Sequence, residues 1–186
     1  MIALIVVLVI AAILVMMVIG AYNRLVTLRQ SANNAFADID VQLKQRQDLI
    51  PNLVETVKGY AAHERGTLDE VIAARAAAAS AGSVEGRVAA ENALSGALGR
   101  LFAVAEAYPD LKANQNFLQL QGELGDVENK LAAARRFFNN AVSEFNAQAQ
   151  SFPAVLFAAS LGFTQRDFFD LGEGRAAAQA APQVKF

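Results

Sequence analysis

The sequence contains no cysteine and only one histidine, His63. The absence of cysteine excludes disulfide bonds, thiol catalysis and thiolate metal sites, although it does not indicate a compartment. A Ser-His-acid arrangement could be built only around His63. His63 and Glu64 begin a zinc-binding HExxH pattern, but position 67 is Thr67 and no second histidine exists. We therefore predict no catalytic residues, no metal site and no bound cofactor.

The sequence also has little net charge. Sixteen Lys and Arg face eighteen Asp and Glu, which gives a formal charge of -2 and a pI near 5.4. A protein that binds nucleic acid would carry a basic stripe, so we predict no nucleic-acid partner. Val, Ile and Thr become scarce after residue 72, alanine supplies 38 residues, and no stretch alternates apolar with polar side chains. These features predict an all-α fold.

No charged side chain precedes Arg24, and residues 2–19 form a run of eighteen apolar residues. A run of this length can cross a bilayer. We predict a transmembrane anchor over residues 1–21 that contacts membrane lipid through residues 2–19. A cleaved signal peptide is the alternative, because Val18 and Gly20 are small enough for a cleavage site. The length of the run and the missing basic region before it favour the anchor.

Basic residues follow the apolar run. Arg24, Arg29, Lys44 and Arg46 all lie within the segment after it. By the positive-inside rule, this distribution predicts a single-pass membrane protein with most of the chain in the cytoplasm.

The longest soluble helix is predicted over residues 114–152, where apolar residues recur at spacings of three and four. A helix of this length extends for roughly 50 Å and needs long helical partners to bury its apolar face. The predicted core positions are Phe117, Leu120, Leu124, Val127, Leu131, Ala134, Phe138, Ala141, Phe145, Gln148 and Phe152.

The rest of the chain supplies these partners. No glycine or proline interrupts residues 22–50, so the anchor is predicted to continue directly into the first soluble helix. Pro51 is expected to kink or break this helix, after which a second segment runs to about Ala79. A third helix is predicted over residues 84–107, because Pro109 prevents its continuation. The anchor is thus followed by a long antiparallel bundle of about four helices.

Residues 154–171 are rich in phenylalanine and carry few charges. They are predicted either to fold back and cap one end of the bundle, or to form an interfacial or partner-binding segment. Residues 173–186 have too little apolar mass to fold alone and are predicted to be a C-terminal tail, which leaves residues 22–172 as the bundle domain. The candidate interface or membrane-contact residues are Phe157, Phe163, Phe168 and Phe169.

A second stripe of small and polar residues lies one position after the core stripe of the long helix. Gly125 and Ala132 are predicted to allow a neighbouring helix to approach closely, while the polar members need hydrogen-bond partners. We interpret them as a polar network that fixes helix register, with a ligand or partner site as the alternative. The candidate members of the network are Arg46, Asp48, Asn52, Glu128, Arg135, Asn139 and Asn146.

Three stretches of the chain resemble the LemA family of bacterial membrane-anchored helical proteins. They are DIDVQLKQRQDLIPNLVETVKGYAAHE at residues 38–64, YPDLKANQNFLQLQGEL at 108–124 and ENKLAAARRFFNNAVSEFN at 128–146. The apolar run and the segment SFPAVLFAASLGF extend the resemblance over nearly the whole chain. Phe138 and Phe145 stand where the family often has tyrosine, so no role for a phenol hydroxyl is expected there. The resemblance implies a helical bundle behind one membrane span, and no established catalytic chemistry.

These observations predict a non-enzymatic helical scaffold in the bacterial inner membrane that forms a homo-oligomer or presents a helical surface to a partner protein of unknown identity. A sensory or signalling bundle coupled to its anchor is the alternative, and it would need an extracytoplasmic domain. Ala11, Ala12 and Gly20 do not form a small-xxx-small motif, so the contacts between subunits are expected to come from the soluble helices and from residues 154–171.

Overall fold

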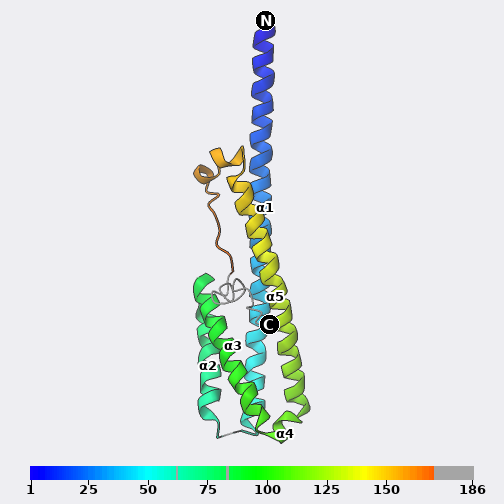
Figure 1. The fold of residues 1–186 in the computed structure, drawn as a ribbon, viewed down its shortest axis with the longest axis vertical. Coiled ribbons are helices and arrows are strands. Elements are labelled where there is room, and N and C mark those ends of the chain that lie inside the picture. Colours follow the sequence, from blue (N-terminus) through cyan, green and yellow to red (C-terminus); the bar gives the residue numbers. More distant parts are fainter. Residues whose placement is uncertain (62, 83, 170–186) are drawn as a thin grey trace, which may run out of the picture. The chain divides into compact units, whose positions relative to one another are not determined.

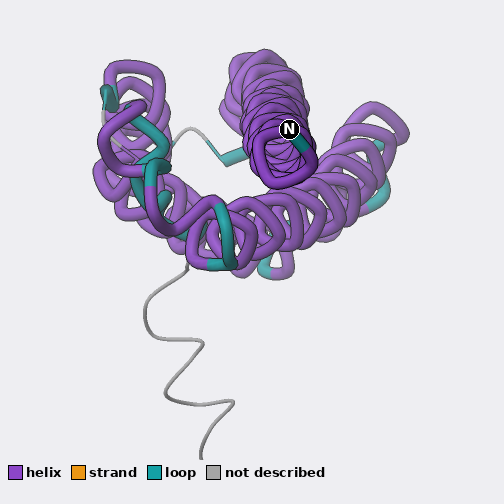
Figure 2. Tube along the Cα trace, turned by 90° about the horizontal axis from the view of Figure 1, so that it is seen from above, coloured by secondary structure: helices purple, strands orange, loops and turns teal. Residues whose placement is uncertain are grey.

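The computed structural model describes residues 1–61, 63–82 and 84–169, and within these ranges the chain forms helices joined by short turns, with no strand (Figures 1 and 2). The prediction of an all-α fold is confirmed. The predicted tail, residues 173–186, lies outside the described residues. The helices are α1 (Ile2–Lys58), α2 (Arg65–Ser80), α3 (Val84–Glu106), α4 (Pro109–Lys112) and α5 (Gln115–Gln150), followed by the 3-10 turns η1 (Ala154–Leu156) and η2 (Ala159–Leu161).

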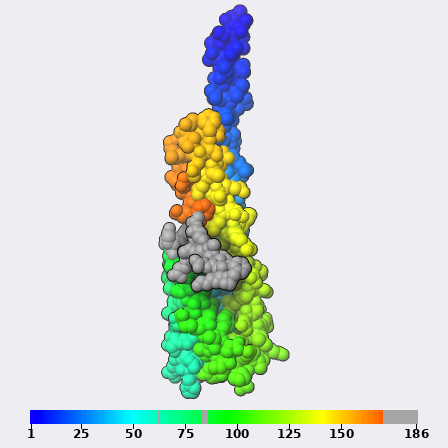
Figure 3. Space-filling model, in the orientation of Figure 1, coloured from blue at the N-terminus to red at the C-terminus, as the bar shows by residue number. Residues whose placement is uncertain are grey.

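The first third of α1 is the apolar run. Among the described helices, α1 alone is long and apolar enough to cross a membrane, and none of its most apolar window is buried in the protein. Every side chain from residue 2 to residue 19 is exposed, and Figure 3 shows this end of the chain in blue. Within the described residues the run therefore packs against no other segment, as expected for a helix that is solvated by lipid.

Of the two outcomes expected at Pro51, the break is wrong, because α1 passes through this residue and ends at Lys58, and the kink stays a prediction. Proline removes one backbone hydrogen bond from a helix interior and costs about 3 kcal/mol. Its neighbours Ile50 and Leu53 are fully buried, and burying each such side chain contributes about 1.5–3 kcal/mol. Packing of this helix face outweighs the proline, and the interruption comes instead at Gly59, which is followed by the turn into α2.

The predicted helix over residues 84–107 agrees with α3, and the long helix predicted over 114–152 agrees with most of α5. The predicted core position Phe152 is wrong, since its side chain is 68% exposed. The reason is that α5 ends at Gln150, so the helical spacing that placed Phe152 in the core no longer applies. The predicted core residues of α5 that are buried are Phe117, Leu124, Val127, Leu131, Phe138, Ala141 and Phe145.

The chain forms two compact units, and α1 and α5 each contribute to both. The first unit consists of residues 1–39 and 133–168. In it the two helices are antiparallel, because Phe36 of α1 packs against Phe138 of α5 while the earlier residue Leu25 shares a cluster with the later residue Phe145. The predicted division of the chain into an anchor and one bundle over residues 22–172 stays a prediction.

The second unit consists of residues 40–132 and 169–186, of which the structure describes 40–61, 63–82, 84–132 and 169. Helices α2 and α3 form an antiparallel pair, which packs with the later part of α1, with α4 and with the first half of α5 around one apolar core. The largest fully buried side chains of this core are Ile50, Leu53, Val57, Val71, Leu94, Leu101 and Leu111.

Candidate functional site

Arg46 joins three helices of the second unit. Arg46 lies in the buried face of α1, three residues after Leu43, at a position where the helical pattern would place an apolar residue. Its side chain is buried, and the residue is only 4% exposed. Its Nη1 donates to Oε2 of Glu91 at 2.9 Å, and its Nη2 donates to the Ser95 hydroxyl at 2.8 Å, both on α3. The Glu128 carboxylate of α5 lies 3.4 Å from Nη2. One guanidinium thus holds α1, α3 and α5 in a single register.

The charges of this cluster are unequally buried. Glu91 is 1% exposed, whereas the side chain of Glu128 is 46% exposed. A buried charge is tolerated only when it is paired and hydrogen-bonded, and the planar fork of arginine suits two carboxylates and a hydroxyl at once. The Arg46–Glu91 pair therefore favours one register of α1 against α3, because a shift of either helix would break a hydrogen bond between two buried charges.

A groove opens beside the Arg46 cluster. It has a volume of about 470 Å³. We call it the glycine groove, because Gly99 of α3 and Gly125 of α5 line it. A Cβ added to either glycine would meet nothing within 4 Å. The close helix approach predicted at Gly125 is therefore wrong for the described part of the chain. The groove is lined by Arg46, Ser95, Leu98, Gly99, Phe102, Gln121, Leu124, Gly125 and Glu128.

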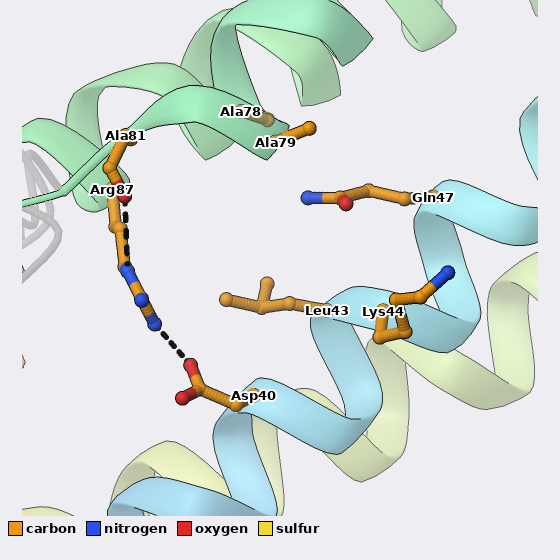
Figure 4. A pocket seen from close by; sticks show the side chains of 8 residues that line it. All are labelled: Asp40, Leu43, Lys44, Gln47, Ala78, Ala79, Ala81 and Arg87. Carbon is orange, nitrogen blue, oxygen red and sulfur yellow. Dashed lines mark hydrogen bonds and ion pairs between the residues drawn. The ribbon is translucent and has the colours of Figure 1, made fainter.

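A smaller pocket of about 160 Å³ lies between α1 and the end of α2. Figure 4 shows Asp40 and Arg87 reaching toward each other along one side of it, while Leu43 points into the space. Arg87 forms an ion pair with Asp40, and its Nε donates to the carbonyl of Ala81 at 3.2 Å. Arg87 therefore connects the loop after α2 to α1. Because its charge is paired with that of Asp40, the pocket presents little unpaired charge to a ligand.

The first unit contains an aromatic cluster around Phe163, which is 3% exposed. Its ring centroid lies 5.5 Å from that of Tyr22 and 6.4 Å from that of Phe145. The Arg29 guanidinium lies over the same ring, 4.8 Å from its centroid, in a cation–π contact. We call residues 151–168 the C-terminal strap, since Phe163 fastens this segment to α1 and α5.

Hydrogen bonds fasten the C-terminal strap a second time. The Asn146 side chain of α5 accepts from the backbone N–H of Arg166 and donates to its carbonyl, both at 2.9 Å. The guanidinium of Arg166 then donates to the Asn33 side chain of α1 at 2.6 Å. A segment with only two short 3-10 turns is therefore held to both helices of the first unit by its side chains and backbone.

Comparison with known proteins adds to this geometry. A family model described as the LemA family matches residues 35–186. The chain belongs to the LemA family. This confirms the resemblance found in the sequence, and the shared features fit a membrane-associated helical protein.

This LemA-family chain is also similar to curated relatives. It is 23% identical to the magnetosome protein MamQ of Magnetospirillum gryphiswaldense over 174 residues, covering 80% of this chain and 64% of MamQ. It is 25% identical to the magnetosome protein MamQ 2 of Paramagnetospirillum magneticum with the same coverage. It is 25% identical to Protein LemA of Metamycoplasma hominis, covering 72% of this chain and 62% of that protein. The LemA-family chain thus spans less than two thirds of the length of these relatives.

The structure brings together two members of the predicted polar network, Arg46 and Glu128. Asp48 is exposed and pairs with Lys44 one turn earlier in α1, and Asn52 is also exposed. These two side chains therefore lie on the outer surface of α1, while Arg46 lies on its buried face. The reason is helical phase, because Asp48 and Asn52 follow Arg46 by two and six residues, which rotates them away from it.

The remaining predicted network residues lie on the first-unit part of α5. Arg135 is 9% exposed, and Asn139 is half-buried. Asn146 serves the C-terminal strap. Of the phenylalanines predicted for an interface or membrane contact, Phe163 and Phe169 are buried, at 3% and 2% exposure. Phe157 is half-buried and Phe168 is 42% exposed.

Sequence reasoning missed Glu91, Ser95 and Arg166. Glu91 carried a detectable signal, because it lies three residues after Val88 and three before Leu94, in the apolar stripe of α3. A charge at such a position needs a buried partner. Arg166 carried no comparable signal, since it lies outside any helix, where apolar spacing does not mark a face. Within the described ranges, no group of three or more His, Asp or Glu is arranged to hold a metal ion.

Proposed function

We propose that this protein is a non-enzymatic, membrane-anchored helical scaffold that self-associates or presents a helical surface to a partner protein at the cytoplasmic membrane. The observation that carries the proposal is the contrast within α1. Its first eighteen residues are apolar and all exposed, whereas side chains of its later residues are buried in the two folded units. Such an exposed apolar rod is stable only in lipid, and it keeps the folded units next to the membrane.

The glycine groove supports the binding part of the proposal. Glycine in a helix interior costs about 1 kcal/mol relative to alanine, and no atom of the described chain requires Gly99 or Gly125 to lack a side chain. An apolar floor with a polar end at Arg46 and Glu128 is suited to a helix of a second copy or of a partner. Residues of both α3 and α5 form the apolar floor of the groove, so the floor is an extended surface.

The membrane part can be tested with thiols introduced into the cysteine-free chain. Ser143→Cys on α5 and Ser80→Cys on α2 place one exposed thiol in each unit. We expect a membrane-impermeant maleimide to label both variants only after spheroplasts are permeabilised. The protein should also stay with the membrane during alkaline extraction. Release by alkali would contradict the anchor.

Labelling of both thiols in intact spheroplasts would place the folded units outside the cytoplasm. That outcome would favour the alternative function, a sensory or signalling bundle coupled to its anchor, over a cytoplasmic scaffold. The distribution of Arg24 and Arg29 directly after the apolar run supports the cytoplasmic placement.

Self-association can be tested by filling the glycine groove. Gly125→Leu should remain folded, because there is space for the side chain and the helix propensity improves by roughly 1 kcal/mol. Gly122→Leu is the matched control, since Gly122 lies on the same helix with equally open surroundings but does not line the groove. We expect Gly125→Leu to reduce the particle mass of the full-length protein in mild detergent, and Gly122→Leu to leave it unchanged. Equal masses for both variants would remove the groove from the interface.

A further inference from the structure

The C-terminal strap exposes an unusual amount of apolar surface. No charged residue occurs between Glu144 and Arg166. Four large apolar side chains of this segment are more than half exposed, although Ala154, Ala158 and Phe163 of the same strap are buried in a cluster with residues of α1 and α5. We call them the apolar edge: Phe152 at 68%, Val155 at 53%, Leu156 at 74% and Leu161 at 52%.

The apolar edge lies at the level where α1 leaves the apolar run. Ala154 and Ala158, which alternate with the exposed residues, share a buried cluster with Ala21 and Leu25. Tyr22, three residues after Ile19, packs against Phe163 of the same strap. Three residues of helix advance about 4.5 Å, so the strap packs against the first turns after the run.

The direction of the helices leads to the same placement. Because α1 and α5 are antiparallel in the first unit, the end of α5 points toward the end of α1 from which the apolar run extends. Figure 1 shows the turns η1 and η2, in orange, at that end of α5 beside α1. The strap is therefore the part of the first unit that is nearest to the membrane surface.

We propose that the apolar edge enters the head-group region of the bilayer that α1 spans, and so gives the protein a second, interfacial membrane contact. This inference rests on the proposed membrane anchor. The occupant is lipid because the edge continues the apolar surface of the run at its membrane boundary. Tyr22 adds an aromatic ring at the same level, where aromatic residues are enriched in membrane proteins.

The backbone of the strap is suited to this environment. A polar backbone group that leaves water must be hydrogen-bonded within the protein. In the strap, the hydroxyls of Ser151 and Ser160 donate to the backbone carbonyls of Ala147 and Phe157, at 2.7 and 2.8 Å. Backbone N–H groups with partners inside the segment include those of Val155, Leu156, Phe157, Ala158, Leu161, Gly162 and Phe163.

Basic side chains at the same level complement the apolar edge. Arg24 is exposed one helical turn after Gly20, and Arg29 lies over the Phe163 ring. Arginine near the membrane surface is attracted to anionic lipid head groups. With the apolar run in the bilayer and the apolar edge in the head-group region, the first unit would have two membrane contacts. Together they would restrict the rotation and tilt of α1, which a single span leaves free.

The absence of tryptophan allows a direct test with single tryptophans in the full-length chain. Leu156→Trp reports on the apolar edge, and Ile10→Trp reports on the middle of the run. Leu118→Trp is the control, because Leu118 is 50% exposed on the second-unit part of α5. Each variant is reconstituted into vesicles of phosphatidylcholine and phosphatidylglycerol. The acyl chains carry bromine either near the head group or near the methyl end, and bromine quenches nearby tryptophan.

We expect Leu156→Trp to be quenched several-fold more than Leu118→Trp, and more by shallow than by deep bromine. Ile10→Trp should be quenched more by deep bromine. If Leu156→Trp is quenched no more than Leu118→Trp while Ile10→Trp is quenched, the interfacial contact is overturned and the anchor stands. An unquenched Ile10→Trp overturns the anchor and the contact together.

A blue-shifted but unquenched Leu156→Trp would show that a second copy or another protein covers the edge, which also overturns the lipid contact. Leu161→Trp repeats the measurement at a second exposed position, so the result does not depend on the folding of one variant. Thermal melting followed by circular dichroism checks that each variant is folded.

Discussion

The two compact units hold their helices by different interactions. In the second unit, a buried guanidinium, Arg46, pairs with the fully buried carboxylate of Glu91. In the first unit, aromatic rings around Phe163 join the C-terminal strap to α1 and α5. Charge pairing demands one register, whereas ring packing tolerates small displacements. Each unit should therefore fail for a different reason when these contacts are removed.

Arg46→Ala should destabilise the second unit by about 3–5 kcal/mol, because it removes a hydrogen-bonded positive charge from beside the buried Glu91 carboxylate. Urea denaturation of the chain measures this effect, and hydrogen exchange should locate the loosened amides within residues 40–132. The double variant Arg46→Met with Glu91→Leu removes both charges and should recover most of the lost stability. If the double variant is as unstable as Arg46→Ala, the buried Glu91 charge is not the cause of the destabilisation.

Phe138→Ala should destabilise the first unit by about 3–5 kcal/mol, since it removes a buried ring that packs against Phe36 at 5.5 Å. Phe137→Ala is the matched control, because the neighbouring Phe137 is 56% exposed. The same denaturation experiment should give a small change for the control. The loosened amides should lie in residues 22–39 and 133–168, and uniform loosening of the whole chain would contradict the division into two units.

Asn146→Ala should cost about 1–3 kcal/mol, because it removes both hydrogen bonds to the Arg166 backbone and leaves those groups without their partner. The expected signal is faster hydrogen exchange in the C-terminal strap, with little change in the second unit. Asn140→Ala, at an exposed position of the same helix, should leave exchange in the strap unchanged. Equal effects of both variants would show that the strap is held by its rings alone.

The smallest expected effect concerns pH. The hydrogen bond from the Tyr108 hydroxyl to the Glu64 carboxylate raises the pKa of Tyr108 above its ordinary value of 10.0, with desolvation adding to the shift. Because the folded pKa is higher than the unfolded one, this contribution is present below pH 10 and is lost as pH rises through the folded pKa. Tyr108→Phe should lose this pH dependence. Denaturation midpoints of both proteins across the alkaline range measure the difference, and parallel curves would contradict it.

Local patterns in the sequence determined much of the fold. The apolar run alone indicates the membrane-spanning part of α1, because its length and lack of charge depend on no other element. Pro109 predicts where α3 ends. The spacing of apolar residues predicts the buried face of α5, since a regular helix repeats every 3.6 residues. Phe138, Leu131 and Leu124 are buried as this spacing requires.

Only the tertiary structure decided which groups meet. Periodicity indicates that Arg46 lies on a buried face, but its partner Glu91 is 45 residues away in the chain and is selected by the packing of α1 against α3. The same packing carries α1 through Pro51, where local propensity predicts a break. The end of α5 at Gln150 leaves Phe152 exposed and returns Phe163 to the core of the first unit. A helical pattern specifies a face, and the element that covers that face is chosen by contacts between residues far apart in sequence.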